Sequence, residues 1–380
     1  MVIGVEGNVH VGKTTYIKER FSKSHIINET SFKPDMNDYD RQLYYIEKEV
    51  EKKKQLFEDT ILDRTIISTL IYTLYTDSLS PLEKKRLINI IKTKINNEKI
   101  IVPSFIHLIL YPYKLITLNH SKLFEEKGTQ DSLVDYDYYL KYSLFFSNFN
   151  DSINKIYSTK NYRQIISYNS DIFNNITDSR KYNSKIIVDG CPAIGKSTIG
   201  GLQKKYEYIK EFTYKKYTLN DYSNQINSII DRVNILNKEN ILIDTSFLMG
   251  ITHLFYNKKT TKKMRLEMVD EIMKKIPLNY YITRIFYLVL DKKSLIERKS
   301  NDSLKERKHF FDNLNYLDNE INFYEVINRR LGPMSNISFI DASKKIDELI
   351  SIIENSDNDK PLMLIDLFYE IREAIEEGEL

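Results

Sequence analysis

One short motif occurs twice in this chain of 380 residues and constrains its fold more than any other feature. The pattern Gly-x-x-x-x-Gly-Lys-Ser/Thr, typical of phosphate-binding loops, spans residues 7–14 and again residues 190–197. Each copy follows a short apolar run, at residues 2–5 and 186–188, and precedes a segment that can form a helix. The sequence therefore predicts two nucleotide-binding loops, or one such loop and a decayed copy, whose first glycines lie 183 positions apart.

The chemistry of phosphate explains the residue types in these loops. Phosphate is a dense anion, so converging backbone N–H groups and the positive end of a helix stabilise it. We expect the lysine of each loop to reach the outer phosphates and the following hydroxyl to hold Mg²⁺. The predicted nucleotide-binding residues are Gly7, Gly12, Lys13, Thr14 and Thr15 in the first loop, and Gly190, Gly195, Lys196, Ser197 and Thr198 in the second.

Other features recur at nearly the same offset, so the repeat extends beyond the loops. They are an acid after the second predicted strand, a glutamine in the pattern Asn-Asp-Tyr-x-x-Gln, and an aspartate that ends a third strand. In chain order these pairs are Glu29 and Glu211, Gln42 and Gln225, and Asp63 and Asp244. Alternating strands and helices predict an α/β fold in each half, a parallel sheet flanked by helices. Open sheets of this kind bind ligands at the carboxyl ends of their strands, where these acids lie.

The repeat predicts two tandem domains and a tail. We expect a first P-loop domain at residues 1–178, a second at 184–354, and a linker with a C-terminal helix at 355–380. Apolar residues on one side of residues 362–375 predict an amphipathic helix that docks on its own body or on a second subunit. The last five residues are expected to fray.

At this point the residues resemble the superfamily of deoxynucleoside kinases and thymidylate kinases. Residues 5–16 are similar to that family's phosphate loop, and residues 339–345 are similar to its last strand and the turn that borders the adenine. The resemblance implies that Glu29 accepts the proton of the sugar 5′-hydroxyl and that Gln42 pairs with the nucleobase. It also places Asp63-Arg64-Thr65 on the family's Glu-Arg-Ser motif, whose acid serves Mg²⁺ and whose arginine serves phosphate. The resemblance covers about residues 1–175 and 184–353.

The two halves depart from the family in different ways. The family's lid carries several arginines, but the first half offers only His120, Lys122 and Lys127 after its fourth strand. The second half has Arg298 and Arg307 as lid candidates, yet it has Thr245 where the first half has Arg64. The distance in sequence from Glu29 to Gln42 is also shorter than the family usually has.

Phosphoryl transfer demands positioning and charge neutralisation more than covalent chemistry. A carboxylate near the acceptor hydroxyl takes its proton, and a second carboxylate orients Mg²⁺. An arginine stabilises the charge that develops on the transferred phosphoryl group, and its loss lowers the rate by about 10³-fold or more. The predicted catalytic residues are Glu29, Asp63, Arg64, Glu211 and Asp244, the metal ligands Thr14, Asp63, Ser197 and Asp244, and the substrate contacts Gln42 and Gln225. Because the second half lacks the arginine after its aspartate, the first half is favoured as the catalytic one.

Two classes of function follow, each with ATP and Mg²⁺ as the expected ligands of an intact site. The first is a kinase of deoxynucleosides, with a thymidine-like acceptor favoured by Glu29 and a nucleoside monophosphate, above all thymidylate, as the variant. The second is a catalytically decayed kinase fold repurposed as a structural or self-assembling protein, with a nucleotide-gated regulator as a third reading. A composite site between the halves and a homo-oligomer or higher assembly also stay open.

Composition excludes several other classes. A formal charge of +3, from 56 basic and 53 acidic residues, provides no basic field for nucleic acid. One cysteine, no apolar run of transmembrane length and no signal peptide predict an intracellular, cytoplasmic protein that is neither secreted nor membrane-bound. The richness in Ile, Asn, Lys and Tyr suggests an AT-rich genome, and a large DNA virus is our hypothesis for the source.

Overall fold

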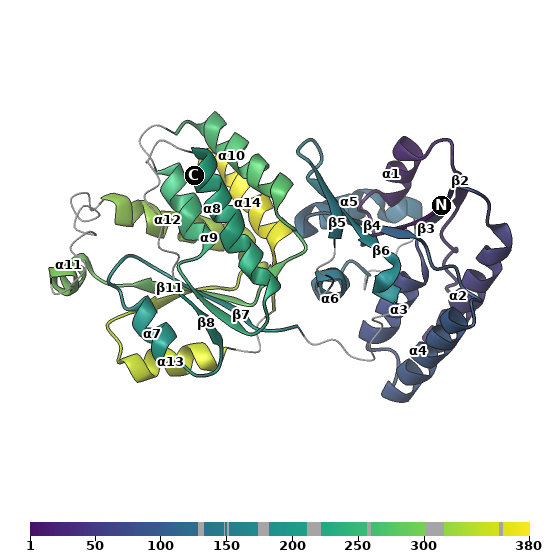
Figure 1. Cartoon of the computed structure of the whole chain (residues 1–380), viewed down its shortest axis with the longest axis horizontal. Helices are drawn as coiled ribbons and strands as arrows, with labels where there is room; N and C mark the ends of the chain where they lie inside the picture. Colours follow the sequence, from purple (N-terminus) through teal and green to yellow (C-terminus); the bar gives the residue numbers. More distant parts are fainter. Residues whose placement is uncertain are drawn as a thin grey trace. The chain divides into compact units, whose positions relative to one another are not determined.

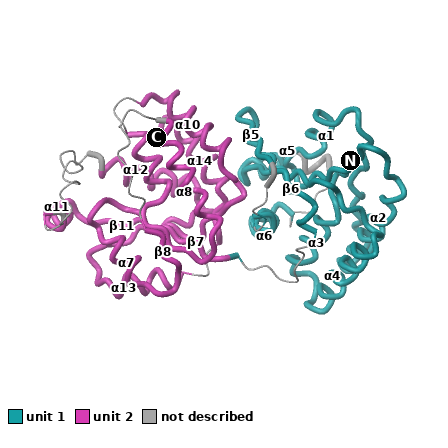
Figure 2. Tube along the Cα trace, viewed as in Figure 1, with its two compact units in different colours: residues 1–182 teal, residues 183–380 magenta. Residues whose placement is uncertain are grey.

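Each of the two units of the chain is built around one main β-sheet. The computed structural model describes residues 1–127, 133–147, 149, 152–173, 182–210, 222–256, 260–300, 315–356 and 360–380. The first unit comprises Met1–Tyr182 and the second Asn183–Leu380 (Figure 2). Among the residues so described, no helix is both long and apolar enough to cross a membrane.

The sheet of unit 1 has six strands in the spatial order β2-β3-β1-β4-β6-β5 (Figure 1). Strand β1 runs parallel to β3 and β4, and β2 runs parallel to β3. In chain order the strands are β1 (Val2–Glu6), β2 (His25–Ile27), β3 (Thr60–Asp63), β4 (Phe105–Leu110), β5 (Ser152–Ser158) and β6 (Arg163–Asn169).

The expectation of a wholly parallel sheet is wrong for the last two strands of unit 1. Strand β6 is antiparallel to β4, and β5 is antiparallel to β6. Ser158 pairs with Arg163, so only a short turn joins the two strands. Such a connection can form only an antiparallel hairpin, because a parallel pair needs a crossover of a dozen or more residues. The first residue of β6 therefore lies at the edge of the sheet where the parallel strands end.

Helices of unit 1 begin where short polar side chains can cap them. Asn37, Thr65 and Ser80 each accept a hydrogen bond from a backbone N–H of the first turn. Ser80 and Glu83 form a reciprocal capping box. The helices are α1 (Lys13–Arg20), α2 (Asp38–Lys52), α3 (Ile66–Tyr75), α4 (Pro81–Asn96), α5 (Tyr113–Lys127) and α6 (Tyr136–Ser147).

The main sheet of unit 2 has five strands, all parallel, in the spatial order β8-β9-β7-β11-β12. Its first four strands have the same order and relative direction as β2-β3-β1-β4 in unit 1. The fifth strand differs, because β12 is parallel to its neighbour β11, whereas β6 is antiparallel to its neighbour β4. A separate two-residue antiparallel pair joins β10 (Tyr281–Ile282) to β13 (Leu362–Met363). The five main strands are β7 (Lys185–Asp189), β8 (Glu207–Ile209), β9 (Ile241–Asp244), β11 (Arg284–Val289) and β12 (Ile337–Asp341).

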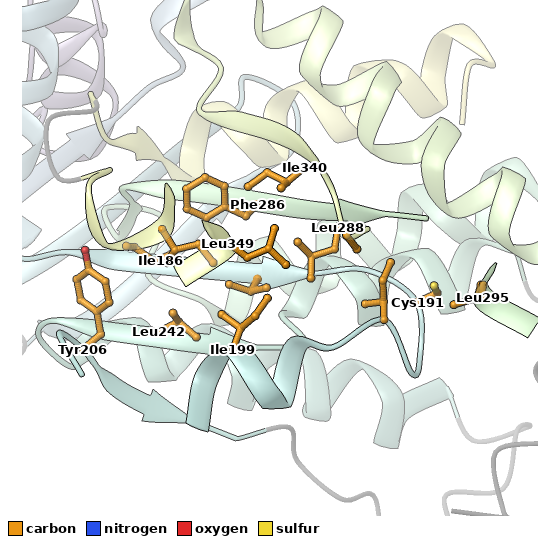
Figure 3. Packing of buried hydrophobic residues seen from close by; sticks show 14 of the residues in the cluster. Ile186, Cys191, Ile199, Tyr206, Leu242, Phe286, Leu288, Leu295, Ile340 and Leu349 are labelled. Carbon is orange, nitrogen blue, oxygen red and sulfur yellow. The ribbon is translucent and has the colours of Figure 1, made fainter. Parts of the chain in front are cut away.

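Helices cover both faces of this second sheet, α7 and α13 on one face and α8, α9, α10, α12 and α14 on the other (Figure 1). Figure 3 shows Ile186, Leu242 and Phe286 of the strands meeting Ile199 of α7 and Leu349 of α13 in one buried apolar layer. The helices are α7 (Lys196–Leu202), α8 (Tyr222–Asn234), α9 (Phe247–Phe255), α10 (Lys262–Lys275), α11 (Lys292–Ser300), α12 (Asn315–Leu331), α13 (Ile346–Glu354) and α14 (Leu364–Glu377).

The C-terminal helix α14 docks on its own unit, between α10 and α12. Every residue of Leu364–Ile371 is buried, so this part of the helix is covered all round rather than along one amphipathic stripe. Phe368 stacks on Phe247 of α9 with ring centroids 5.8 Å apart. The expectation of a frayed end is wrong, because Leu380 is buried and Glu379 forms an ion pair with Arg329 at 3.1 Å.

Candidate active site

The first phosphate loop connects β1 to α1 and needs glycine at both ends. Gly7 and Gly12 have φ angles of 153° and 81°, in the left-handed region that other residues rarely adopt. A Cβ on Gly7 would also lie 2.8 Å from the carbonyl oxygen of Ile109. Inside the loop, the buried Lys13 Nζ donates to the carbonyls of Gly7 at 3.2 Å and Asn8 at 3.0 Å. The ammonium group is thereby held over the cradle that the backbone forms.

A buried carboxylate supports the stem of this loop. Glu6 Oε1 accepts hydrogen bonds from the backbone N–H and the hydroxyl of Thr65 at 2.8 and 2.7 Å. Its Oε2 accepts from Ser68 Oγ and from the Tyr142 hydroxyl, both at 2.6 Å. The same Tyr142 oxygen accepts from the Gly7 N–H at 3.1 Å. Burial and the Glu6 charge raise the pKa of Tyr142 well above its usual range, so its hydroxyl stays a donor.

The predicted metal ligands of unit 1 lie together. Thr14 Oγ1 donates to Asp63 Oδ2 at 3.1 Å, and Asp63 Oδ1 is buried without a hydrogen-bond partner among the described residues. A hydroxyl and an unsatisfied carboxylate oxygen beside a phosphate loop suit Mg²⁺, which prefers oxygen ligands and takes most of them from phosphate and water. No cluster of three or more His, Cys, Asp or Glu side chains in the described ranges could hold a metal without such help. The residues of unit 1 therefore fit Mg²⁺.

The predicted base and arginine form an ion pair, with Arg64 Nε 2.5 Å from Glu29 Oε1. Arg64 also donates from Nη1 to the Gly7 carbonyl at 3.3 Å and to Ser68 Oγ at 2.9 Å. Burial acts to raise the pKa of Glu29, but the positive charges of Arg64 and Lys13 outweigh it and hold this pKa below its usual range. Glu29 is consequently ionised at neutral pH and can accept a proton.

The loop lysine has an unusual protonation equilibrium. Burial, and then the charge of Arg64, lower the pKa of Lys13 to about 8, against the opposing effect of Glu29 and Asp63. Without a bound anion, a fraction of Lys13 is therefore neutral in mildly alkaline solution.

Lys13, Thr14, Glu29 and Arg64 line one cavity of about 640 Å³, a size typical of small-molecule sites, whereas Asp63 is not among its lining residues and adjoins it through Thr14. Gln42 lines it from α2; this side chain is buried, and its Oε1 has no hydrogen-bond partner in the described parts of the chain. Of the residues predicted from sequence, the cavity is lined by Gly12, Lys13, Thr14, Thr15, Glu29, Gln42 and Arg64. The structure thus brings Glu29, Arg64, Gln42 and the phosphate loop of unit 1 to one place.

Sequence reasoning missed three basic residues that line this cavity, Arg41, Lys52 and Arg163, the last of which is the first residue of β6. A Cβ on Gly12 would lie 2.4 Å from Arg163 Nη2, so the guanidinium group lies against the phosphate loop. It also lies over the ring of Tyr111, 5.4 Å from the centroid. Of the residues expected in a lid, His120 contacts His10 of the loop, with Nδ1 and Nε2 3.2 Å apart.

Unit 2 repeats the loop and its support with different residues. Lys196 Nζ donates to the Gly190 carbonyl at 2.6 Å. The buried Asp189 accepts from the backbone N–H and the hydroxyl of Ser246 at 2.7 and 2.6 Å, and from the Tyr324 hydroxyl at 2.6 Å. This arrangement corresponds to that of Glu6, because in both units a carboxylate at the end of the loop strand binds a helix start and a distant tyrosine.

The metal position of unit 2 differs from that of unit 1. Asp244 Oδ2 accepts from Ser197 Oγ at 2.6 Å and from the Tyr208 hydroxyl at 2.9 Å. Asp244 Oδ1 accepts from Thr245 Oγ1 at 3.0 Å. Both carboxylate oxygens are thus already satisfied by protein hydroxyls, so these residues do not fit Mg²⁺ in the way Thr14 and Asp63 do.

The other predicted residues of unit 2 are only partly brought together. Arg298 donates to the carbonyls of Ile194 at 3.2 Å and Ala342 at 3.0 Å, which places this lid candidate against the second loop. Gln225 is half-buried on α8, and Thr198 is exposed on α7. Glu211 and Arg307 lie outside the described residues.

Comparisons with known proteins add likenesses to solved structures. No protein-family model and no curated protein matches the chain. A deoxyadenosine kinase from M. mycoides with bound dATP is 21% identical with a TM-score of 0.37, over 46% of this chain and 100% of that one. A thymidylate kinase from Candida albicans is 18% identical with a TM-score of 0.32, over 48% and 99%. A gluconokinase from Sinorhizobium meliloti 1021 is 14% identical with a TM-score of 0.25, over 52% and 98%.

Proposed function

We propose that unit 1 is an ATP- and Mg²⁺-dependent phosphotransferase that phosphorylates the 5′-hydroxyl of a deoxynucleoside. One observation carries the proposal. The phosphate-loop lysine Lys13, the hydroxyl of Thr14 beside Asp63, and the Glu29–Arg64 ion pair converge at a single cavity of about 640 Å³. A phosphate cradle, a metal-binding pair and a proton acceptor with its arginine are the parts that phosphoryl transfer requires.

In this mechanism the residues of unit 1 hold and neutralise rather than form covalent bonds. The loop N–H groups and Lys13 bind the phosphates, and Arg64 stabilises the charge that develops between donor and acceptor. Glu29 accepts the proton of the attacking hydroxyl, and its ion pair with Arg64 fixes its position. Thr14 and Asp63 would hold Mg²⁺, which would supply neutralisation of the phosphate charge.

The acceptor we favour is a thymidine-like deoxynucleoside. Gln42 lines the cavity and carries a carbonyl oxygen and an NH₂ group on one amide; its Oε1 is buried and has no hydrogen-bond partner among the described residues. A base with an N–H beside a carbonyl matches that amide in both directions. Glu29 favours a neutral hydroxyl over a 5′-phosphate, because a carboxylate repels a phosphate at the same place.

We also propose that the chain arose by tandem duplication of one α/β unit. The shared strand order and the two buried carboxylate networks support this proposal. Unit 1 is favoured as the active half because it keeps Arg64, where unit 2 has Thr245, and because Asp63 keeps an unsatisfied oxygen.

The test is transfer of labelled γ-phosphate from ATP, with Mg²⁺, to a panel of nucleosides and nucleoside monophosphates. Lys13→Ala is expected to abolish turnover, whereas Lys196→Ala is expected to retain it. Thermal unfolding of both variants controls for the loss of a buried side chain. Turnover only on monophosphates would refute the nucleoside acceptor. No turnover on any acceptor by the folded wild-type protein would refute the enzyme and favour the non-catalytic alternative.

A further inference from the structure

Tyr208 provides a hydroxyl at a position where unit 1 has none. In unit 1, Ile26 of β2 pairs with Ile61 of β3; in unit 2, Tyr208 of β8 pairs with Leu242 of β9 in the same register. Ile26 is therefore the counterpart of Tyr208, and an isoleucine cannot donate a hydrogen bond. The tyrosine hydroxyl instead reaches the aspartate that ends the neighbouring strand.

A second difference makes room for the tyrosine ring. Gly200 on α7 is the fourth residue after the loop lysine, where unit 1 has the buried Ile17 on α1. A Cβ on Gly200 would lie 2.1 Å from Cε2 of Tyr208, so the ring crosses the helix where a side chain is missing. Unit 1 has isoleucine at both positions, whereas unit 2 has a smaller residue on the helix and a larger one on the strand, so the tyrosine ring lies across α7.

Each carboxylate oxygen of the aspartate that the tyrosine reaches already accepts at least one hydrogen bond from a protein hydroxyl. Ser197 and Tyr208 donate to Asp244 Oδ2 at 2.6 and 2.9 Å, and Thr245 donates to Oδ1 at 3.0 Å. A divalent cation at this position would have to displace hydroxyl donors from a buried carboxylate. Among the described residues of unit 1, only Thr14 donates to the corresponding Asp63.

We infer that Tyr208, assisted by Thr245, closes the second phosphate loop to divalent cations. Unit 2 is therefore not a second metal-dependent phosphotransferase, and the whole chain takes one divalent cation together with nucleotide. The expectation that one divalent cation binds per chain rests on the proposed function of unit 1. The inference that the phosphate loop of unit 2 excludes such a cation does not.

The test counts Mn²⁺ bound to the full chain by equilibrium dialysis against Mn²⁺ and ADP, as the excess of Mn²⁺ on the protein side over the protein-free side. We expect one Mn²⁺ per wild-type chain and none after Asp63→Asn. Removing two of the three hydroxyls, in the double variant Tyr208→Phe with Thr245→Ala, is expected to raise the count from one to two.

A second double variant should free Asp244 for a cation without replacing Tyr208. Gly200→Ala puts a methyl group where the ring of Tyr208 lies and so moves the hydroxyl away from Asp244. Combined with Thr245→Ala, it is expected to give the same count of two. Gly201→Ala is the matched control, because a Cβ there meets no atom within 4 Å. Its combination with Thr245→Ala is expected to stay at one.

The outcomes separate this inference from the function of unit 1. A wild-type count of two that falls to one in Asp244→Asn would overturn the inference and leave unit 1 untouched. Counts that stay at one in both opened variants, each folded by thermal unfolding, would also overturn it. A wild-type count of zero that rises to one in the opened variants would support the closure by Tyr208 and refute the metal site of unit 1.

Discussion

Replacing Glu29 by glutamine tests the proposed chemistry of unit 1 most directly, because it removes the proposed proton acceptor and nearly preserves the size of the side chain. General base catalysis contributes about 10²- to 10⁴-fold in rate, or about 2.7–5.4 kcal/mol in the barrier. We therefore expect kcat to fall by about that factor. Thermal unfolding must accompany the assay, because Glu29 is 49% exposed but its partner Arg64 is only 13% exposed and loses its ion pair in this variant.

The ion pair between Glu29 and Arg64 determines in which direction activity and stability change with pH. The positive charges of Arg64 and Lys13 outweigh burial and lower the pKa of Glu29, so the base is ionised at all but acidic pH. Wild-type kcat/KM should fall only below the usual carboxyl range, and Glu29→Gln should remove that acidic limb. Because the pKa is lowered on folding, the pair stabilises the protein above the unfolded pKa, and this stabilisation is lost as the pH falls through the folded pKa.

The assay is steady-state phosphotransfer to the best acceptor of the panel across this pH range. Glu47→Gln is the matched control: this glutamate also pairs with a cation, Lys94 at 2.8 Å, but it is 61% exposed and does not line the cavity. It should leave kcat and the pH profile unchanged. A loss smaller than about tenfold in Glu29→Gln, with the acidic limb intact, would refute the assignment of Glu29 as the base.

Three further predictions concern a proton, a cation and a core. Nucleotide binding near pH 8.5 should be accompanied by proton uptake, because the negative charge of the phosphates raises the pKa of Lys13 from its lowered value of about 8. Calorimetry of binding in buffers of different ionisation enthalpy measures this uptake. The variant Lys13→Met should abolish it. Arg163→Met should raise KM for ATP by about 10- to 150-fold and leave KM for the acceptor unchanged, because a hydrogen bond to a charged group contributes about 1.5–3 kcal/mol. Equal changes in both KM values would contradict a position of the Arg163 guanidinium beside Gly12 of the phosphate loop. Phe368→Ala should destabilise unit 2 by about 3–5 kcal/mol, since the ring is fully buried against Phe247, and calorimetry should show the Tm of that unit about 6–20 °C lower. A shift below about 2 °C would show that the site collapses around the lost ring.

The loops could be predicted from sequence because their geometry is encoded locally. Two glycines at positive φ, a lysine and a hydroxyl stand within eight residues, and the aspartates end apolar strands that pair with the loop strand. The direction of the last strand in unit 1 was not encoded in this way. The repeat suggested a parallel strand, as β12 is in unit 2, but the short turn between β5 and β6 forces an antiparallel one.

The residues that sequence reasoning missed are those that act through distant partners. Tyr142 and Tyr324 support the two loops, but in a chain with 28 tyrosines neither stands out by type. Their separation of 182 positions, close to that of the loops, was the available signal. Arg163 and Tyr208 had no such signal. Arg163 begins β6, whose direction relative to its neighbour differs from that of β12 in unit 2. Tyr208 lies at a position where unit 1 has Ile26.

The hydrogen bond from Gly7 to Tyr142 also bears on the order of folding. The loop lies at the very start of the chain, yet the hydroxyl that supports it lies 135 positions further on, in α6. Closing so long a segment has an entropic cost that must be met before the contact can form. A nascent chain that ends before α6 has the whole motif but not its final support. Nucleotide can therefore stabilise unit 1 only after α6 has docked, late in folding.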